Sequence, residues 1–342
     1  MIKMLFTHIL RISLVTSLIL LLILLITGCT IFGTNIPGKM PGTSFDGSVN
    51  ALTPAELSIK SDLFNHIDYL SETIGPRHME DGSLYRAAEY IKSEFSKMGY
   101  QTTTQDYKVD NKIARNIIAE LKGTEDADKI IIIGGHYDTG ANTKGANDNA
   151  SGIAATLALA KIFSNKHQKY TIRFVAFANE EPPYFHSETM GSLVYARQLK
   201  ADNENIIAML SLETMGYYSN EKGSQKYPPP LNWFYPDTGN FIGFVSNLNS
   251  EDLLYRAITS FRKNSEMPSE GGIIADFVPG VGWSDHWSFW QVDYPAIMVT
   301  DTAVFRYPHY HRSTDTIDKI DFDSLTRVVS GLEKVVENLA NK

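Results

Sequence analysis

The stretch that decides the fold is residues 129–152, with the sequence KIIIIGGHYDTGANTKGANDNASG. Its apolar run from Ile130 to Ile133 is typical of a strand that is buried on both faces. This strand would deliver His136 and Asp138 at its carboxyl end, and Asp148 follows at the entrance of a helical segment. Open α/β sheets bind ligands outside the carboxyl ends of their strands. One imidazole and two carboxylates at this edge suit a hard or borderline divalent cation such as Zn²⁺.

The rest of the chain predicts strands that alternate with helices. Tyr170–Asn179 and Ile206–Glu213 are apolar enough for interior strands, and Gln101–Val109 with Ile113–Leu121 predicts an antiparallel hairpin. Helices are predicted over residues 54–70, 84–98, 149–164, 191–199, 251–263 and 322–339, and shorter strands over 242–247 and 295–300. Such alternation indicates an α/β fold. We expect a three-layer α/β/α sandwich around a mixed, mostly parallel central sheet.

The composition is that of a globular protein. The chain has 342 residues, of which 43% are hydrophobic and 20% are charged. Its formal net charge of -8 disfavours nucleic acid or an anionic membrane surface as a partner, because like charges repel. We therefore expect no binding of nucleic acid.

The N-terminus has the features of an export signal. Two basic residues, Lys3 and Arg11, precede the almost wholly apolar run 12–26. The run ends at Ile26-Thr27-Gly28-Cys29, which resembles a bacterial lipobox, where the cysteine carries the lipid and begins the mature chain. A retained, uncleaved anchor is the alternative. Cys29 is the only cysteine of the sequence, so the mature domain can hold no internal disulfide.

The chain is therefore predicted to have three parts. Residues 1–28 are a lipoprotein signal peptide, and residues 29–53, rich in Gly, Pro, Ser, Thr and Asn, are a flexible tether. Residues 54–342 form a single catalytic domain. The protein would be exported and held on the periplasmic or extracellular face of a membrane through the lipid on Cys29.

Potential metal ligands follow three of the predicted strands. They are His136 with Asp138, then Glu180 with Glu181, then Glu213, and His311 stands in a turn-rich stretch late in the chain. A carboxylate at a strand end is by itself more typical of a helix cap or a solvated loop. Since all of these residues are predicted at one edge of the sheet, caps alone do not explain the pattern.

These motifs, taken in order, resemble those of the zinc exopeptidases of the bacterial leucyl aminopeptidase type. The matching pieces are His136-Tyr137-Asp138, Asp148–Gly152, Glu180-Glu181, Gly191-Ser192, Leu212-Glu213, Ser284-Asp285-His286 and Tyr310-His311. The superfamily also includes glutamate carboxypeptidase, glutaminyl cyclase and the transferrin receptor ectodomain. The resemblance extends over most of the chain after the tether, and the combination is far more specific than any single piece.

The resemblance implies two zinc ions per chain that share the carboxylate of Asp148. His136 and Glu213 would complete one site, and Glu181 and His311 the other. Three protein ligands per ion leave a position for a water molecule, as a catalytic zinc requires. A water that bridges both ions would be acidified and positioned for attack.

The same resemblance assigns roles to two further carboxylates. Glu180 would be the general base that takes a proton from the water and passes it to the leaving amine. Asp138 would accept a hydrogen bond from the ring nitrogen of His136 that does not hold metal. The peptide bond after Asp148 is expected to be cis. Glu213 departs from the pattern, because several family members carry aspartate at that position.

Several assignments stay open in the sequence. Asp285 and His286 match a family motif and are expected near the site, without a role as ligands. His311 is preferred to the neighbouring His309 because it begins a His-x-x-x-Asp-Thr pattern. The segment 216–240, with four tyrosines and four prolines, is expected to rim or cover the site.

The leading hypothesis is a lipid-anchored, zinc-dependent aminopeptidase that acts on peptides. A carboxypeptidase, a glutaminyl cyclase-like enzyme and a non-catalytic ectodomain are the alternatives. An acidic group near the site would bind a free amine, and Glu188 and Asp285 are the candidates for it. Five aromatic residues are candidates for the wall of a specificity pocket, with an ordinary packed loop as the alternative: Tyr217, Tyr218, Trp233, Phe234 and Tyr235.

Overall fold

A computed structural model describes residues 39–80 and 82–341. Its strands are β1 (Thr102–Val109), β2 (Lys112–Leu121), β3 (Lys129–His136), β4 (Thr171–Phe177), β5 (Asn205–Glu213), β6 (Ile242–Ser246), β7 (Ser269–Ile273) and β8 (Ala296–Thr300). Its α-helices are α2 (Pro54–Asp68), α3 (Ser83–Lys97), α4 (Gly152–Phe163), α5 (Gly191–Ala201), α6 (Glu251–Asn264), α7 (His286–Trp290) and α8 (Phe322–Leu339). The predicted signal peptide and Cys29 lie outside the described residues.

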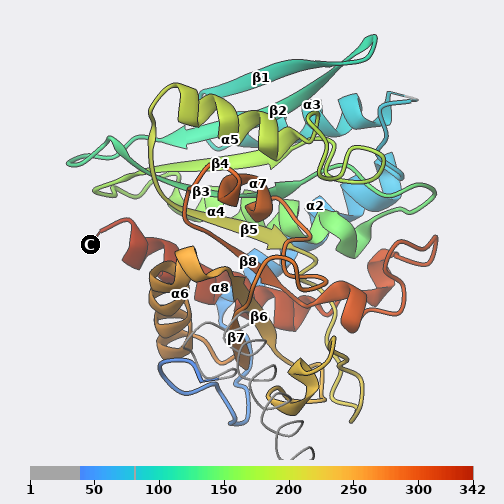
Figure 1. The fold of residues 1–342 in the computed structure, drawn as a ribbon, viewed down its shortest axis with the longest axis vertical. Helices are drawn as coiled ribbons and strands as arrows, with labels where there is room; N and C mark the ends of the chain where they lie inside the picture. Colours follow the sequence, from blue (N-terminus) through green and yellow to red (C-terminus); the bar gives the residue numbers. More distant parts are fainter. Residues whose placement is uncertain (1–38, 81, 342) are drawn as a thin grey trace, which may run out of the picture.

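The strands form one mixed sheet in the order β1-β2-β4-β3-β5-β8-β6-β7 (Figure 1). Four neighbouring pairs are parallel, namely β3 with β4, β3 with β5, β5 with β8, and β6 with β7. The predicted hairpin of β1 and β2 is antiparallel, as are the pairs β2 with β4 and β6 with β8. The mixed, mostly parallel sheet is thus confirmed.

Helices cover both faces of this sheet (Figure 1). The four isoleucines of β3 show why: Ile131 and Ile133 belong to a core shared with α2, α3, α4, α6 and α8, whereas Ile130 and Ile132 face α5 and α7. Successive side chains of a strand point to opposite faces, so a strand buried on both sides must be apolar throughout. The expected three-layer sandwich follows from this pattern.

The first described helix begins where its capping residues predict. The hydroxyl of Thr53 accepts a hydrogen bond from the main-chain N–H of Glu56 at 3.3 Å, and the Glu56 carboxylate accepts one from the N–H of Thr53 at 2.8 Å. Pro54 occupies the first turn, where its missing N–H costs nothing. Helix α2 therefore begins at Pro54, directly after its capping residue.

The described part of the predicted tether lies along the domain. The guanidinium of Arg262 in α6 donates to the carbonyl oxygens of Met40, Pro41 and Gly42, each at 3.2 Å. The hydroxyl of Ser44 accepts a hydrogen bond from the N–H of Ser269 at 2.8 Å, on the outer strand β7. Residues 40–44 thus have the composition of a linker but are held on the domain by hydrogen bonds, most of them to their main chain. Within residues 39–80 and 82–341, we find no helix with the length and apolarity needed to cross a bilayer.

Two short elements have no counterpart in the sequence predictions. Strand β7 has the sequence SEGGI, in which two glycines and a glutamate hide any strand pattern. Helix α7 spans only five residues, too few for a helical period. Both elements form in the context of the sheet, β7 by parallel pairing with β6 and α7 by packing on α5 and β8.

Candidate metal centre and adjoining pocket

The predicted ligands meet because four neighbouring strands are parallel. Strands β4, β3, β5 and β8 lie side by side, so their carboxyl ends share one edge of the sheet. Strand β3 ends at His136 and β5 at Glu213. Gly135 permits the close approach of these strands, since a Cβ there would lie 2.5 Å from the carbonyl oxygen of Leu212. Asp148 stands in the turn that leads into α4.

A first cluster forms around His136. Its Nε2 atom lies 3.2 Å from Oε2 of Glu213 and 3.5 Å from Oδ1 of Asp148. All three side chains are buried, and each can offer one ligand atom within 4.8 Å of the others. The longer Glu213 side chain reaches this position while its Oε2 also accepts a hydrogen bond from the hydroxyl of Ser284 at 2.8 Å.

A second cluster forms around His311. Its Nε2 atom lies 3.2 Å from Oδ2 of Asp148 and 3.2 Å from Oε2 of Glu181. These three ligand atoms also lie within 4.8 Å of one another. Asp148 therefore directs one carboxylate oxygen to each cluster, which is the arrangement expected of a residue shared by two cations.

The donor atoms fit zinc. Each cluster offers one imidazole nitrogen and two carboxylate oxygens, and both kinds of atom are ordinary zinc ligands. Oε1 of Glu181 is buried without a hydrogen-bond partner, and the buried Oδ2 of Asp148 has only the imidazole of His311 beside it. A buried carboxylate oxygen without a partner is costly, and a bound cation would supply the missing interaction.

Electrostatics point to the same conclusion. Burial raises the pKa of Glu180 well above its usual value and that of Glu181 to about 7, and neighbouring carboxylates add to both shifts. Burial alone would lower the pKa of His136, but the carboxylates of Glu180 and Glu213 outweigh it and raise that pKa. Buried acids this close together retain protons rather than all ionise. A divalent cation would take the place of those protons.

Asp138 connects the ends of β3 and β4. Its carboxylate accepts hydrogen bonds from the main-chain N–H groups of Glu180 at 3.1 Å and Glu181 at 2.9 Å. Its Oδ1 atom also lies 3.5 Å from Nδ1 of His136, on the side of the ring that faces away from the cluster. Glu180 belongs to neither cluster, and its Oε2 lies 3.8 Å from Nε2 of His136.

One positioning residue escaped the sequence reasoning. The carboxylate of Asp315 accepts hydrogen bonds from the N–H groups of Asn147 at 2.9 Å and Asp148 at 3.1 Å, and from the hydroxyl of Tyr307 at 2.8 Å. Asp315 thus holds the main chain of the shared ligand. Its place in the His-x-x-x-Asp-Thr pattern was the one signal in the sequence that could have linked Asp315 to the site. The peptide bond between Asp148 and Asn149 is cis, as the resemblance implies.

The other polar residues singled out in the sequence belong to neither cluster. His309 contacts the hydroxyl of Thr314 at 2.8 Å, and the imidazole of His286 contacts the carbonyl oxygen of Val281 at 2.7 Å. Asp285 is near the centre but fully buried, and Glu188 pairs with Arg197 on the surface. Neither Asp285 nor Glu188 is therefore placed to bind the amine of a substrate.

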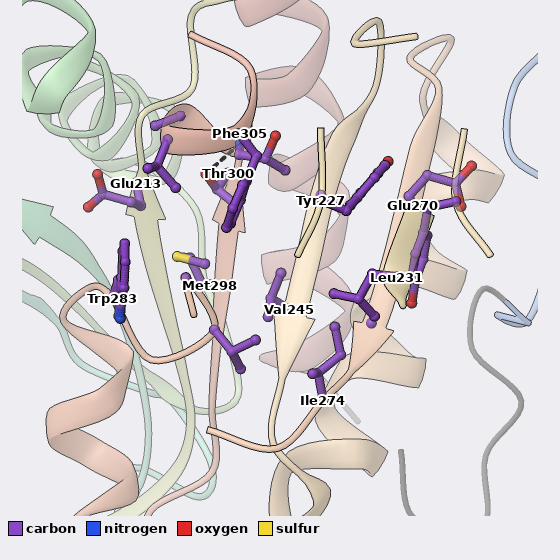
Figure 2. A pocket seen from close by; sticks show the side chains of 18 of the residues that line it. Glu213, Tyr227, Leu231, Val245, Glu270, Ile274, Trp283, Met298, Thr300 and Phe305 are labelled. Carbon is purple, nitrogen blue, oxygen red and sulfur yellow. Dashed lines mark hydrogen bonds between the residues drawn. The ribbon is translucent and has the colours of Figure 1, made fainter. Parts of the chain in front are cut away.

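An apolar cavity of about 110 Å³ adjoins the metal centre (Figure 2). Its lining includes Glu213 and Tyr310 together with the apolar side chains of Leu231, Val245 and Met298. The segment 216–240 contributes part of the lining, namely Gln225, Tyr227, Pro228, Leu231 and Tyr235. This agrees with the expectation that the segment rims a site.

The aromatic prediction was only partly right. Of the five aromatic candidates, Tyr235 alone lines the cavity. Trp233 and Phe234 are exposed, Tyr217 packs against Tyr307, and the hydroxyl of Tyr218 donates to the carbonyl oxygen of Met215. Neighbouring aromatic side chains of this segment thus have different surroundings, which the sequence pattern does not reveal.

Comparisons with known proteins agree with this site. The family model of Peptidase family M28 matches residues 116–336. The uncharacterized protein YfbL of Escherichia coli strain K12 is 37% identical over 302 residues, which cover 85% of this chain and 92% of that protein. A probable zinc metalloprotease of Pyrenophora teres f. teres is 25% identical over 316 residues, which cover 84% of this chain but only 60% of that protein.

A solved structure supports the same fold. A zinc aminopeptidase from Bacillus subtilis superposes with a TM-score of 0.68 at 15% identity, over 83% of this chain and 95% of that chain. At this identity the likeness shows a common architecture. Together with the family match and the identity to the Escherichia coli protein, it shows that the chain belongs to peptidase family M28 and is a zinc metallopeptidase.

Proposed function

We propose that this protein is a two-zinc aminopeptidase that removes apolar residues from the N-termini of peptides. The observation that carries the proposal is the pair of clusters that share Asp148. His136, Asp148 and Glu213 would hold one ion, and Asp148, Glu181 and His311 the other. Bound zinc supplies an acidified water and polarises the scissile carbonyl.

Glu180 is the residue that would move protons in this reaction. Its carboxylate lies beside the His136 cluster without belonging to it, and burial raises its pKa. A carboxylate with a raised pKa can accept a proton from an attacking water and return it to the leaving amine. The hydrogen bonds from the N–H groups of Glu180 and Glu181 to Asp138 would hold the base and the neighbouring ligand in different directions.

The lining of the cavity favours a free amine over a free carboxylate as the recognised terminus. Among the described residues that line it there is no lysine, arginine or histidine, whereas Glu213 and Glu270 contribute carboxylates. Recognition of a C-terminal carboxylate normally uses a cationic side chain. An aminopeptidase is therefore preferred to a carboxypeptidase.

The size and chemistry of the cavity indicate the side chain it accepts. Its walls are almost wholly apolar, and its volume is about 110 Å³. An apolar cavity of about 150 Å³ holds a benzene molecule, so the smaller cavity suits leucine or methionine better than an aromatic residue. The amide of a glutamine side chain would find few partners there, because Gln225 already bonds Thr302 and Arg306. This disfavours a glutaminyl cyclase.

The location of the enzyme is part of the proposal. We propose that the protein is exported and held on a membrane by a lipid on Cys29, where it would act on peptides outside the cytoplasm. The basic start, the apolar run and the lipobox-like ending support this. Metabolic labelling with a palmitate analogue should mark the wild-type chain and leave Cys29→Ser unmarked.

The function is tested by a metal count together with a substrate panel on the whole chain. We expect two zinc ions per chain and fast cleavage of leucyl and methionyl anilides, with slower cleavage of lysyl and aspartyl ones. Peptides with an acetylated N-terminus should not be cleaved. One zinc per chain, release of C-terminal residues from blocked peptides, or cyclisation of glutaminyl peptides would each contradict the proposal.

A further inference from the structure

A buried arginine lies behind the loop that joins the two ends of the metal centre. Arg77 has no solvent-accessible surface, which is rare for so large a cation. Its guanidinium donates five hydrogen bonds to main-chain carbonyl oxygens: Nε to Tyr137 at 2.7 Å, Nη1 to Leu70 at 3.0 Å, to Gly75 at 3.2 Å and to Lys144 at 2.8 Å, and Nη2 to Gly145 at 2.9 Å. The planar fork thus holds two separate stretches of backbone.

These bonds fix both ends of one loop, residues 137–145. Tyr137 directly follows His136, and Gly145 stands three residues before Asp148. The main chain of Arg77 adds two bonds in the middle, since its N–H donates to the hydroxyl of Thr139 at 3.0 Å and its carbonyl accepts from the Thr139 N–H at 3.2 Å. The loop that separates the two proposed ligands is therefore held at its start, centre and end.

The charge of Arg77 also acts on the centre. Asp138, Asp148, Glu181 and Asp315 are close enough to oppose the effect of burial on its pKa, which falls only to about 10. The side chain therefore stays cationic at neutral pH. All five side-chain hydrogen bonds go to carbonyl oxygens, so the guanidinium forms no ion pair with a single carboxylate. Its positive charge therefore favours the ionised form of several nearby carboxylates.

We propose that Arg77 is a positioning residue that assembles the metal centre before zinc binds. It holds His136, Asp138 and Asp148 at their mutual spacing, and it lowers the cost of bringing several carboxylates together. The inference rests on the zinc ligands assigned in the proposed function. It adds a residue that is remote in the sequence from the predicted motifs. In the sequence, the segment Gly75-Pro76-Arg77 indicates only the end of a helix.

The test measures zinc affinity rather than turnover, by competition with a chromophoric chelator on the whole chain. Arg77→Met removes both fork and charge, and Arg77→Lys keeps only the charge. Partners that support metal ligands typically change affinity by about 10- to 100-fold. We therefore expect zinc to bind about 100-fold more weakly to Arg77→Met and about tenfold more weakly to Arg77→Lys.

Arg262 provides the matched control. Its guanidinium also holds several carbonyl oxygens, but at the outer strand β7, far from the ligands. Arg262→Lys and Arg262→Met should lower the melting temperature and leave zinc affinity unchanged. A folded Arg77→Met with wild-type zinc affinity would overturn the proposal, since it would reduce Arg77 to a structural clamp.

If Arg77→Met does not fold, Arg77→Lys decides, and unchanged affinity in that variant also overturns the proposal. Loss of zinc affinity in the Arg262 variants would also overturn the proposal, because it would mean that any destabilisation of the fold weakens zinc binding. Turnover does not enter these measurements, so a failure of the proposed peptidase reaction would leave their result readable. Conversely, wild-type zinc affinity in the Arg77 variants would leave the peptidase proposal intact.

Discussion

The metal centre and the apolar cavity share one edge of the sheet but are built in opposite ways. The proposed ligands of the centre stand just beyond strand ends or in the loops beside them, and all but the exposed His311 are buried. Hydrogen bonds to the carboxylates of Asp138 and Asp315, and one from the hydroxyl of Ser284, hold them or their main chain. The cavity lies over β6, β7 and β8 and is closed by loops whose apolar side chains make few directional contacts (Figure 2). We therefore expect the reaction to depend on the metal centre and the choice of substrate on the cavity.

This division makes measurable predictions. Changes in the centre should act on the turnover rate or on zinc content and affect all substrates alike. Changes in the cavity should alter the ranking of substrates and leave zinc content untouched. A change in the centre that alters the ranking of substrates, or a change in the cavity that lowers zinc content, would contradict this division between the two regions.

The largest effect is expected from Glu180→Gln. The amide keeps the shape of the side chain but cannot accept the proton, and general base catalysis contributes about 10²- to 10⁴-fold. We expect turnover of all substrates to fall by about 10³-fold or more, with zinc still present at the wild-type ratio because Glu180 belongs to neither cluster. Steady-state kinetics and elemental analysis of the same preparation check this. Near-normal turnover would refute the role of Glu180.

His311→Ala should remove one of the two ions. The cluster of Asp148, Glu181 and His311 would retain only carboxylates, whereas the His136 cluster stays complete. We expect one zinc per chain in place of two, and turnover reduced by about 100-fold, since a metal ion contributes several kcal/mol to such reactions.

His309→Ala is the matched control for this variant. His309 is only two residues away, but its ring contacts the hydroxyl of Thr314 and belongs to neither cluster. It should keep both ions and normal turnover. Equal zinc loss in the two variants would mean that the whole loop, and not one ligand, had been disturbed.

The two regions also differ in how far the sequence could predict them. The centre was predictable because each ligand stands next to a local signal: a buried strand precedes His136 and Glu213, and the His-x-x-x-Asp-Thr pattern distinguishes His311 from His309. The role of Asp315 was not predictable, because its partners at Asn147 and Asp148 are more than 160 residues away in the chain. Motif order shows that a residue belongs to a site but not which atoms it contacts.

The cavity left almost no trace in the sequence. Strand β7, which contributes Glu270, Gly271 and Gly272 to its wall, shows no strand pattern. In the loop beside it, Leu231 and Trp233 stand two residues apart in one 3-10 turn, yet Leu231 lines the cavity and Trp233 is 78% exposed. Such differences depend on how three loops pack together, and tertiary packing has no local period.

Leu231 and Trp233 therefore form a matched pair for the cavity. In Leu231→Ala the cavity loses part of its apolar wall, and we expect the specificity constant for leucyl substrates to fall by about tenfold, with alanyl substrates little affected. Trp233→Ala should leave the specificity constants for both leucyl and alanyl substrates unchanged. Zinc content should equal that of the wild type in both variants. An equal loss for every substrate would show that the wall of the cavity serves catalysis and not selection.

The smallest effect is expected at Glu270, which with Glu213 is one of two carboxylates in the lining of the mostly apolar cavity (Figure 2). Burial raises its pKa, and the nearby charge of Arg262 only partly opposes this shift. An acid whose pKa is higher in the folded state than in the unfolded state binds more protons when folded. Its contribution to stability is therefore fully present below the unfolded pKa of about 4.3 and is lost as pH rises through the raised folded value.

Glu270→Gln should remove this pH dependence without touching the metal centre. At pH 4 the wild type and the variant should unfold at nearly the same temperature, because the carboxyl group is protonated in the folded state and mostly protonated in the unfolded state. At pH 8 the variant should melt about 2 °C higher, since it no longer buries a charge. Thermal melts at both pH values, on protein stripped of zinc to avoid differences in metal loading, measure the difference. A gap of equal size at pH 4 and pH 8 would mean that the amide stabilises the wall by packing, and that the carboxylate of Glu270 is as well solvated as one on the surface.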